Sequence, residues 1–405
     1  MNDRQLATER DDRRPGLWPE VATARSFLCI LAQPAEQPYR EPFAKIPLTA
    51  LKRWLIAQGL GPLAYARFKS VWPELAEALR GDTYAAALEN SMRLEREARI
   101  CRAFAEVGIP VVLLKGAALA HSVYENPAWR PMSDLDLWVR DEQMADALQA
   151  MHEAGFRAKV SSIERPPLLQ KLFDGEIQFV DSDKGLVELH WSPFSGWWLQ
   201  GAATVDNDGL WQRLEPLQRN PSSELPEGER ESGSAGADLF QLAAEDVILQ
   251  LAVHVSINHK FGIWPVRSLL DITLVASKRD VDWGVVVERA RRWRLATVVW
   301  TVLALTQALF DLEELEPVLA ALSPSPLRRR LLRRLMPLET LLADSDLRES
   351  SSRFPLLLLL VDRPLDMVRL SGRMLWPNRD WLEARYGDRA SRRRHLWRVV
   401  RERQI

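Results

Sequence analysis

The sequence predicts an α/β (α+β) protein in which a mixed-sheet core lies between N-terminal helices and a C-terminal all-helical domain. Three observations predict this class. Short runs rich in Val, Ile and Leu alternate with helical patterns between residues 110 and 190. Apolar residues recur at helical spacing through residues 21–108, and the pattern is helical again over residues 238–405.

Length and composition set outer limits on the kind of protein. The chain has 405 residues, of which 47% are hydrophobic and 27% charged, enough for two or three domains with a sizeable core. Its net charge of −1 argues against a generally basic, nucleic-acid-coated surface. Two cysteines, Cys29 and Cys101, exclude a disulfide framework or a cysteine metal site.

The chain also lacks the marks of export. Its charged N-terminus has no apolar segment of the kind found in secretory signals. The apolar run Leu356–Val361 is far shorter than the ~20 residues that a spanning helix needs. We therefore expect a cytoplasmic protein with no transmembrane segment.

The N-terminal part divides into a tail and a helical segment. Residues 1–20 are polar and charged, and their composition predicts disorder. Residues 21–108 form the helical segment. Its last helix is expected to be long, capped at its start by Asp82 or Thr83 and ended by Gly108.

The α/β core is expected over residues 95–215, with four or five strands. Between the strands lie two predicted helices, Ala117–Tyr124 and Asp141–Ala154, and the turn-forming residues 181–185 predict a hairpin. The expected strands, in chain order, are Pro110–Leu114, Asp134–Val139, Phe156–Val160, Ile177–Val180 and Leu186–Leu189.

Residues 216–237 are rich in Pro, Ser, Gly and Glu, which predicts a flexible linker or insertion. From Leu239 to the end we expect helices throughout. Basic residues cluster at 328–334 and at 385–403, and the simplest interpretation is solvated helix faces. The alternative is an anionic partner: nucleic acid, a lipid surface or a polyanionic glycan.

Two acidic residues in an apolar strand are the strongest chemical signal. Asp134 and Asp136 stand two positions apart, so their side chains leave an extended strand on the same face. Such a pair is costly to bury unless a cation or hydrogen-bond donors neutralise it. Glu188 and His190 likewise share one face of their strand. If the two strands are neighbours, Glu188 completes an acidic triad suited to Mg²⁺.

Lys115 and Gly116 stand at a predicted strand-to-helix turn just upstream. A glycine lets the backbone approach a phosphate closely, and a helix N-terminus offers free N–H groups. Lys115 adds a positive charge there. Arg130 precedes the acidic pair by four residues and is placed to clamp a phosphate or to pair with one of these carboxylates.

These motifs resemble the uncharacterised nucleotidyltransferase family of the DNA polymerase β-like superfamily. The matching segments are Lys115-Gly116, Arg130–Leu137 and Val187–Trp191, and the most specific motifs are Ser133–Trp138 and Glu188–Trp191. Ala252–His254, Arg267–Ile272 and the segment from Leu375 to Tyr386 are similar to the family's helical segments.

The resemblance implies a nucleotidyltransferase-type core that transfers a nucleoside monophosphate from an NTP to a hydroxyl. It implies Mg²⁺ (or Mn²⁺) held by Asp134, Asp136 and Glu188, and His190 is an auxiliary candidate. It also implies that the nucleotide or its phosphates contact Lys115, Gly116, Arg130 and Ser133. The superfamily usually has Gly-Gly or Gly-Ser at the first active-site helix, where this chain has Gly116-Ala117. The hydroxyl that would grip the triphosphate is therefore missing.

Residues in the helical part have plainer interpretations. His254 and His259 are expected to be packing or capping residues, and in the alternative His254 approaches the cleft. Arg267 and Asp271, four positions apart, predict an ion pair on a helix surface. In the alternative, they face the α/β core and line the nucleotide pocket.

Two rival functions stay open. A metal-dependent glycosyltransferase also uses a DxD motif at a strand end, but it has no need of Glu188. A catalytically decayed nucleotidyltransferase fold that serves as a binding module would be consistent with Ala117. The acceptor is open among a protein side chain, a sugar, a small molecule and an RNA end, with nucleic acid not favoured.

Overall fold

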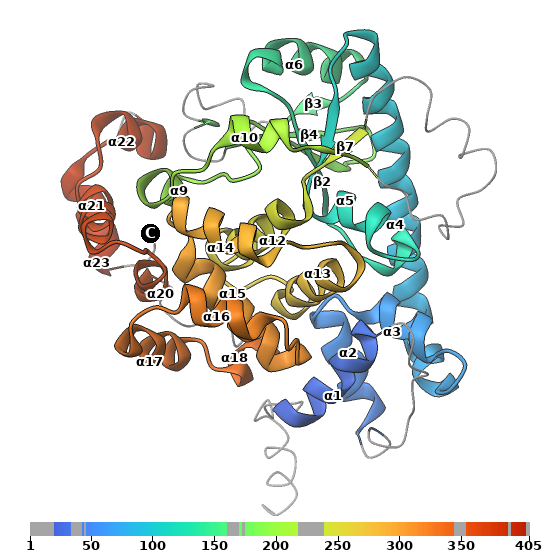
Figure 1. Cartoon of the computed structure of the whole chain (residues 1–405). Coiled ribbons are helices and arrows are strands. Elements are labelled where there is room, and N and C mark those ends of the chain that lie inside the picture. Colours follow the sequence, from blue (N-terminus) through green and yellow to red (C-terminus); the bar gives the residue numbers. More distant parts are fainter. Residues whose placement is uncertain are drawn as a thin grey trace, which may run out of the picture.

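The fold was analysed in a computed structural model of the chain. It describes residues 20–33, 43, 46–159, 170–171, 175–217, 239–343, 354–387 and 390–401. Nearly all of the expected tail (1–20) and most of the expected linker (216–237) lie outside these residues. Figure 1 shows a sheet in the upper half of the molecule and a large body of helices below and beside it.

The sheet is mixed and has seven strands in the order β3-β4-β5-β2-β1-β7-β6. Its centre is a parallel pair, β2 and β5, and β1 and β4 lie antiparallel on either side of that pair. The strands are β1 (Val111–Leu113), β2 (Asp134–Trp138), β3 (Arg157–Ala158), β4 (Glu176–Val180), β5 (Leu186–His190), β6 (Glu215–Pro216) and β7 (Leu239–Gln241). The mixed α/β core predicted from the sequence is confirmed.

Strand β7 corrects one expectation, because the chain is not helical throughout from Leu239. Val111 and Val112 of β1 pair in parallel with Leu239 and Phe240 of β7. The edge of β1 that faces away from β2 would otherwise leave its backbone groups unpaired. The sheet thereby gains β7, and β6 pairs with it in turn.

The two faces of the sheet differ in chemistry, as strand alternation requires. Leu135 and Leu137 of β2 point to one face with Val187 and Leu189 of β5, and all four are buried in an apolar cluster. Helices α4 (Pro73–Glu106) and α6 (Met144–Glu153) contribute to this cluster. The opposite face carries the acidic residues and is turned toward the other helices.

The long helix α4 begins earlier than the sequence predicted. It starts at Pro73 and has 34 residues, so the expected cap at Asp82 or Thr83 is wrong. Proline fits the first turn of a helix, and Thr83 instead donates its hydroxyl to the Leu79 carbonyl at 2.9 Å. The predicted end is confirmed by Gly108, whose φ of +69° suits a glycine after a helix.

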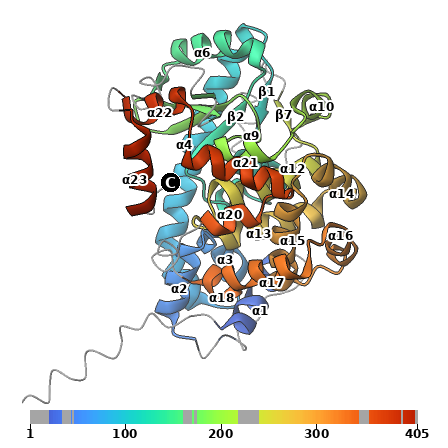
Figure 2. The same cartoon turned by 90° about the vertical axis from the view of Figure 1, so that its left-hand side faces the viewer.

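The N-terminal and C-terminal helices pack together in one large apolar cluster. Trp54 Nε1 donates to the Leu342 carbonyl at 2.9 Å, which links segments 288 residues apart. Figure 2 shows α1, α2 and α3 beside α18 at the base. The N-terminal helices are α1 (Val21–Ala32), α2 (Leu48–Ala57) and α3 (Gly61–Phe68).

The remaining helices surround the site and build the C-terminal part. Within the α/β region lie α5 (Lys115–Ser122), α9 (Trp197–Ala202) and α10 (Asn207–Gln212). The C-terminal helices are α12 (Ala244–Val253), α13 (Pro265–Lys278), α14 (Trp283–Arg292), α15 (Ala296–Phe310), α16 (Leu315–Leu322), α17 (Pro326–Leu335), α18 (Leu338–Leu342), α20 (Phe354–Leu359), α21 (Pro364–Leu375), α22 (Arg379–Tyr386) and α23 (Arg392–Arg401). Among the described residues, no helix has the length and apolar character needed to cross a membrane.

Candidate active site

The acidic residues of β2 and β5 meet because the two strands are direct neighbours. Asp136 is paired with Glu188 in the parallel register, and Asp134 lies two positions before Asp136 on the same face. Asp136 and Glu188 are buried, whereas Asp134 is half-buried at the rim. The structure thus brings Glu188 to the pair Asp134 and Asp136, from which it is separated by more than 50 residues in the sequence.

Asp136 is the centre of this group. Lys115 Nζ donates to Asp136 Oδ1 at 2.8 Å, and Nε2 of His190 lies 2.7 Å from the same oxygen. Burial alone would raise the pKa of Asp136, but Lys115 and His190 outweigh it and hold that pKa below its ordinary range. Burial would lower the pKa of Lys115, yet Asp136 and Glu188 raise it above its usual value. Lys115 and Asp136 are therefore an ion pair.

Glu188 is the carboxyl group that this environment leaves without a cation of its own. Its Oε1 accepts a hydrogen bond from Gln178 Nε2 at 2.8 Å. Burial, and then repulsion from Asp136 and Glu176, raises the pKa of Glu188 to about 9. The cluster therefore holds more carboxyl groups than its own cations neutralise, which is the condition that favours an added metal ion.

The tightest group of ligand atoms is Asp136, Glu188 and His190, which offer atoms within 4.8 Å of one another. Asp134 is not part of that group. Its Oδ2 accepts from Ser133 Oγ at 3.0 Å, and burial followed by repulsion from Asp136 raises its pKa. His190 thus stands nearer the centre than its expected auxiliary role implied, and Asp134 stands nearer the rim.

The turn at Lys115 and Gly116 begins helix α5, as expected. Lys115 has a φ of +45°, a strained conformation for a side chain other than glycine. A Cβ added at Gly116 would lie 2.3 Å from the Nη1 atom of Arg130. The space beside Gly116 is thus filled by a guanidinium group of the protein itself.

Arg130 has a different partner from those considered in the sequence. Its Nε and Nη2 donate to the two carboxylate oxygens of Asp271 at 3.1 and 2.8 Å. Tyr124 also donates its hydroxyl to Asp271, at 2.7 Å. The pairing of Arg130 with Asp134 or Asp136 is therefore wrong, because a fully buried carboxylate from α13 takes both arms of the fork.

The expected surface ion pair between Arg267 and Asp271 is also wrong. Both side chains are buried and turn toward the α/β core. Arg267 Nη1 donates to the Pro131 carbonyl at 2.5 Å, and the guanidinium lies 4.0 Å from the centre of the Trp264 ring. Its Nε has no hydrogen-bond partner among the described residues. Burial, and then repulsion from Arg130, lowers the pKa of Arg267 to about 9.

The segment before α13 is a part of the site that the sequence did not reveal. A π-helix (His254–Asn258) follows α12, and such turns are frequent at functional sites. Lys260, Phe261 and Trp264 then adopt positive φ angles of 51°, 58° and 40°. Strain of this kind persists only where the surroundings fix it, and it gathers at binding sites.

His254 and His259 of this segment face the site. Their rings meet edge to face with centres 4.2 Å apart. Burial first, and Lys115 second, lowers the pKa of both, that of His259 to about 4. Both histidines are therefore neutral at pH 7, and Nδ1 of His254 is buried without a partner among the described residues. In the sequence His254 is flanked by Val253 and Val255, so its setting gave no signal of this role.

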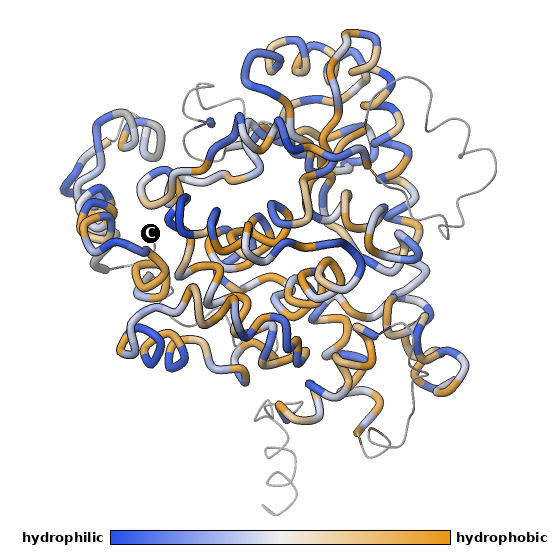
Figure 3. The backbone as a smooth tube through the Cα atoms, viewed as in Figure 1, coloured by the Kyte–Doolittle hydropathy of each residue, from blue (hydrophilic) through white to orange (hydrophobic). Residues whose placement is uncertain are grey.

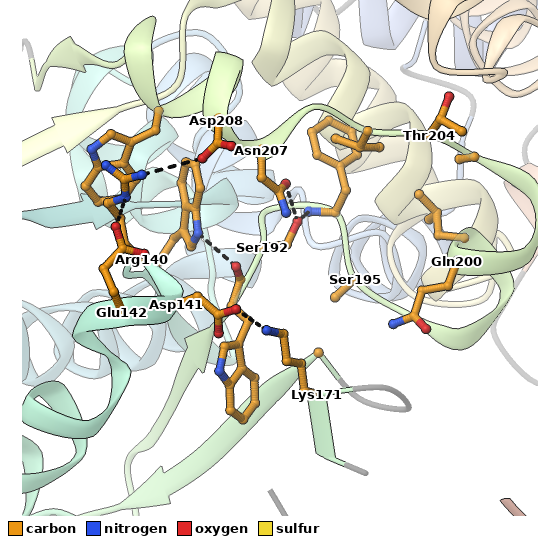
Figure 4. A pocket seen from close by; sticks show the side chains of 18 residues that line it. Arg140, Asp141, Glu142, Lys171, Ser192, Ser195, Gln200, Thr204, Asn207 and Asp208 are labelled. Atoms are coloured by element: carbon orange, nitrogen blue, oxygen red, sulfur yellow. Dashed lines mark hydrogen bonds and ion pairs between the residues drawn. The ribbon is translucent and has the colours of Figure 1, made fainter. Parts of the chain in front are cut away.

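A separate cavity of about 420 Å³ lies at the carboxyl ends of β2 and β5. Its walls include Trp138, Trp191 and Trp211, and Figure 4 shows the polar side chains around its mouth. There, Arg140 pairs with Asp208 and Glu142, and Lys171 with Asp141. None of the three clustered carboxylates lines it, so the cavity and the acidic cluster are distinct parts of the surface.

The class of protein follows from the sheet and the carboxylates that it carries: this is the architecture of a nucleotidyltransferase. A sequence model of the family described as uncharacterised nucleotidyltransferase matches residues 45–311. Since that match covers more than half of the chain, the protein belongs to this nucleotidyltransferase family. Searches of curated proteins and of solved structures give no match.

Proposed function

We propose that the protein transfers a nucleoside monophosphate from an NTP to a hydroxyl acceptor with the help of Mg²⁺ or Mn²⁺. The observation that carries this proposal is the pairing of Asp136 with Glu188 across two parallel strands, with Asp134 on the same face. Membership of the nucleotidyltransferase family supports it. We also propose a cytoplasmic location, with which the absence of a disulfide among the described residues agrees.

The donor set fits a hard divalent cation. Carboxylate oxygens are the ligands that Mg²⁺ prefers, and the raised pKa of Glu188 marks an excess of negative charge. Asp134 and Asp136 would hold the metal ions, with Glu188 as a further ligand. When bound, these ions supply charge neutralisation at the phosphates and at the leaving pyrophosphate. His190 would orient Asp136 through its 2.7 Å contact.

The protein's own groups would then divide the remaining work. The acceptor oxygen forms a bond to the α-phosphorus while the bond to the pyrophosphate oxygen breaks. Glu188 orients the acceptor hydroxyl and takes its proton, since a cation in the site would relieve the repulsion that now raises the pKa of Glu188. Ser133, exposed beside Asp134, is placed at the entrance.

Phosphate binding falls to the cationic side of the site. Lys115 is already ion-paired with Asp136, and Arg267 is buried with an unpartnered Nε among the described residues. We assign both to the triphosphate, and they replace the hydroxyl that Ala117 lacks. Arg130 is committed to Asp271, so it would act by fixing the shape of the Lys115–Gly116 turn rather than by clamping a phosphate alone.

Glu188 distinguishes nucleotidyl transfer from the glycosyltransferase alternative, and turnover distinguishes it from the binding-module alternative. A glycosyltransferase uses its DxD motif without a third carboxylate from a neighbouring strand, whereas here Glu188 is buried directly opposite Asp136. A decayed binding module would keep nucleotide binding without turnover. Both rivals make predictions that differ from nucleotidyl transfer.

The test combines binding and turnover. Titration calorimetry with ATP, GTP, CTP and UTP plus Mg²⁺ is expected to give binding to at least one NTP, and nucleotide-sugars are expected to bind more weakly. Labelled NTPs are expected to mark an acceptor, which mass spectrometry then identifies. Asp136→Ala and Glu188→Gln should each abolish transfer while circular dichroism stays unchanged. Unaltered transfer by Glu188→Gln, or selective binding of nucleotide-sugars, would reject the proposal.

A further inference from the structure

Helix α17 exposes an apolar stripe that the rest of the fold does not cover. Leu327, Leu331 and Leu335 stand four residues apart and are 68%, 38% and 42% exposed. Leu332, on the other side of the helix, is buried in the core. The helix therefore packs through one side and presents three leucines on another.

Helix α21 repeats this arrangement. Leu365, Val368 and Leu375 are 59%, 67% and 47% exposed, and Trp376 just after the helix is 59% exposed. The buried side of α21 consists of Asp366, Leu370 and Met374. Exposed large hydrophobic side chains are ordinary when scattered, but gathered ones mark interaction sites.

The two helices are neighbours. Arg328 of α17 donates to the carbonyls of Val361 and Asp362, at 3.0 and 3.3 Å, just before α21 begins. Both helices lie on the left of Figure 1 and face the viewer in Figure 2. We group the exposed apolar residues of both helices under the name α17–α21 surface: Leu327, Leu331, Leu335, Leu365, Val368, Leu375 and Trp376.

Arg330 and Arg334 stand beside the leucine stripe of α17, whereas Arg329 and Arg333 lie with Leu332 along the wall of a cavity. Arg329, Arg330, Arg333 and Arg334 of α17 make no ion pair with another described residue, and α17 contains no acidic residue. On α21, Arg373 is exposed, and among the described residues Arg369 pairs with Asp366 of the same helix. Hydrophilic and hydrophobic residues alternate along α17 in Figure 3. Since the whole chain has a net charge of −1, this surface is a local concentration of positive charge.

We propose that the α17–α21 surface binds the anionic headgroup layer of a lipid membrane. Leucines and valine would enter the boundary between headgroups and acyl chains, and the arginines would pair with lipid phosphates. Trp376 is of the type enriched at that boundary. Nucleic acid would use the arginines but leave the leucine stripe without a role. This attachment holds the protein on a membrane without crossing it.

The test uses the full chain and sedimentation with vesicles. Vesicles that contain phosphatidylserine are expected to bind the protein, pure phosphatidylcholine vesicles to bind it far less, and added salt to weaken binding. Leu327→Ser with Leu331→Ser, and separately Arg330→Glu with Arg334→Glu, should each lower the partition coefficient by more than about tenfold. These exposed positions should leave the melting temperature unchanged.

Matched controls come from α4. Leu88 is 65% exposed and Arg102 is exposed, so Leu88→Ser and Arg102→Glu make the same chemical changes away from the α17–α21 surface. Both should bind vesicles like the parent protein. The proposal is overturned if pure phosphatidylcholine binds equally well. It is also overturned if only the arginine changes matter, which would indicate a polyanion such as nucleic acid. The proposal is likewise overturned if the parent protein binds no vesicles but is a dimer in solution that Leu327→Ser dissociates.

Discussion

At the scale of single residues, two carboxylate oxygens in the site each contact two neighbouring side chains. Asp136 Oδ1 lies within hydrogen-bond distance of both Lys115 Nζ and His190 Nε2, and Asp271 Oδ1 accepts from both Arg130 Nε and the Tyr124 hydroxyl. Such sharing fixes positions closely, because a shift of one partner disturbs the other.

A substitution at Gly116 tests how closely the position of Arg130 is fixed. Gly116→Ala would place a methyl group 2.3 Å from Arg130 Nη1, whose fork is held by Asp271. We expect the variant to lose about 1–3 kcal/mol of unfolding free energy, the usual cost of overpacking. Chemical denaturation measures it. Gly81→Ala is the control, since Gly81 is exposed in α4 with open space around it and should gain about 0.5–1 kcal/mol. Equal effects at both positions would contradict the steric argument.

At the scale of elements, the hairpin of β4 and β5 is what carries Glu188 to its position. Asp181 closes its turn: Oδ1 accepts from the backbone of Asp183 and Gly185, and Oδ2 accepts from Arg96 at 2.8 Å. Desolvation would raise the pKa of Asp181, but Arg96 and the turn amides hold it below the ordinary value.

Asp181→Asn keeps an acceptor for the turn but removes the charge. We expect a loss of about 1.5–3 kcal/mol at pH 7, the value of hydrogen bonds to a charged group. Because the folded-state pKa is depressed, this stability is present above the unfolded pKa of about 3.9 and disappears as pH falls through the folded one. Urea denaturation from pH 7 to pH 3 should show the parent and the variant converging. Asp183→Asn, exposed in the same turn, should change little at any pH. A gap in unfolding free energy that does not narrow as pH falls below about 4 would contradict this account.

The elements also show how far sequence reasoning reaches. Side chains alternate along β2 and β5 whatever their distant contacts, so the local sequence was enough to predict that Asp134 and Asp136 share a face. The pairing of Asp136 with Glu188 needed one assumption about adjacency. The partner of Arg130 is 141 residues away on a different element, and no local pattern indicates it. The strained residues Lys260–Trp264 were unreadable for the same reason, because only surrounding contacts hold positive φ angles at residues with side chains.

At the scale of the whole molecule, one buried ion pair joins the α/β core to the helices. Asp271 is fully buried and balances Arg130, with Arg267 close enough to influence its charge. This pair ties the Lys115–Gly116 turn to α13.

Asp271→Asn would leave Arg130 buried without a counter-charge. We expect a loss of about 3–5 kcal/mol of unfolding free energy, as when one partner of a buried pair is removed. Thermal and chemical unfolding measure it. Asp311→Asn is the matched control, since Asp311 pairs with Arg25 at 2.5 Å but is 72% exposed, and it should cost less than about 1 kcal/mol. Similar losses in the two variants would refute the special weight given to burial.

Helix α4 has a mechanical consequence for how substrates enter. With 34 residues it is about 50 Å long, and it runs unbroken from the N-terminal helices to the back of the sheet. Because α4 is continuous, the sheet and the N-terminal helices are not expected to move apart about a flexible joint. We therefore expect substrates to reach the site at the rim, beside the exposed Ser133 and the half-buried Asp134.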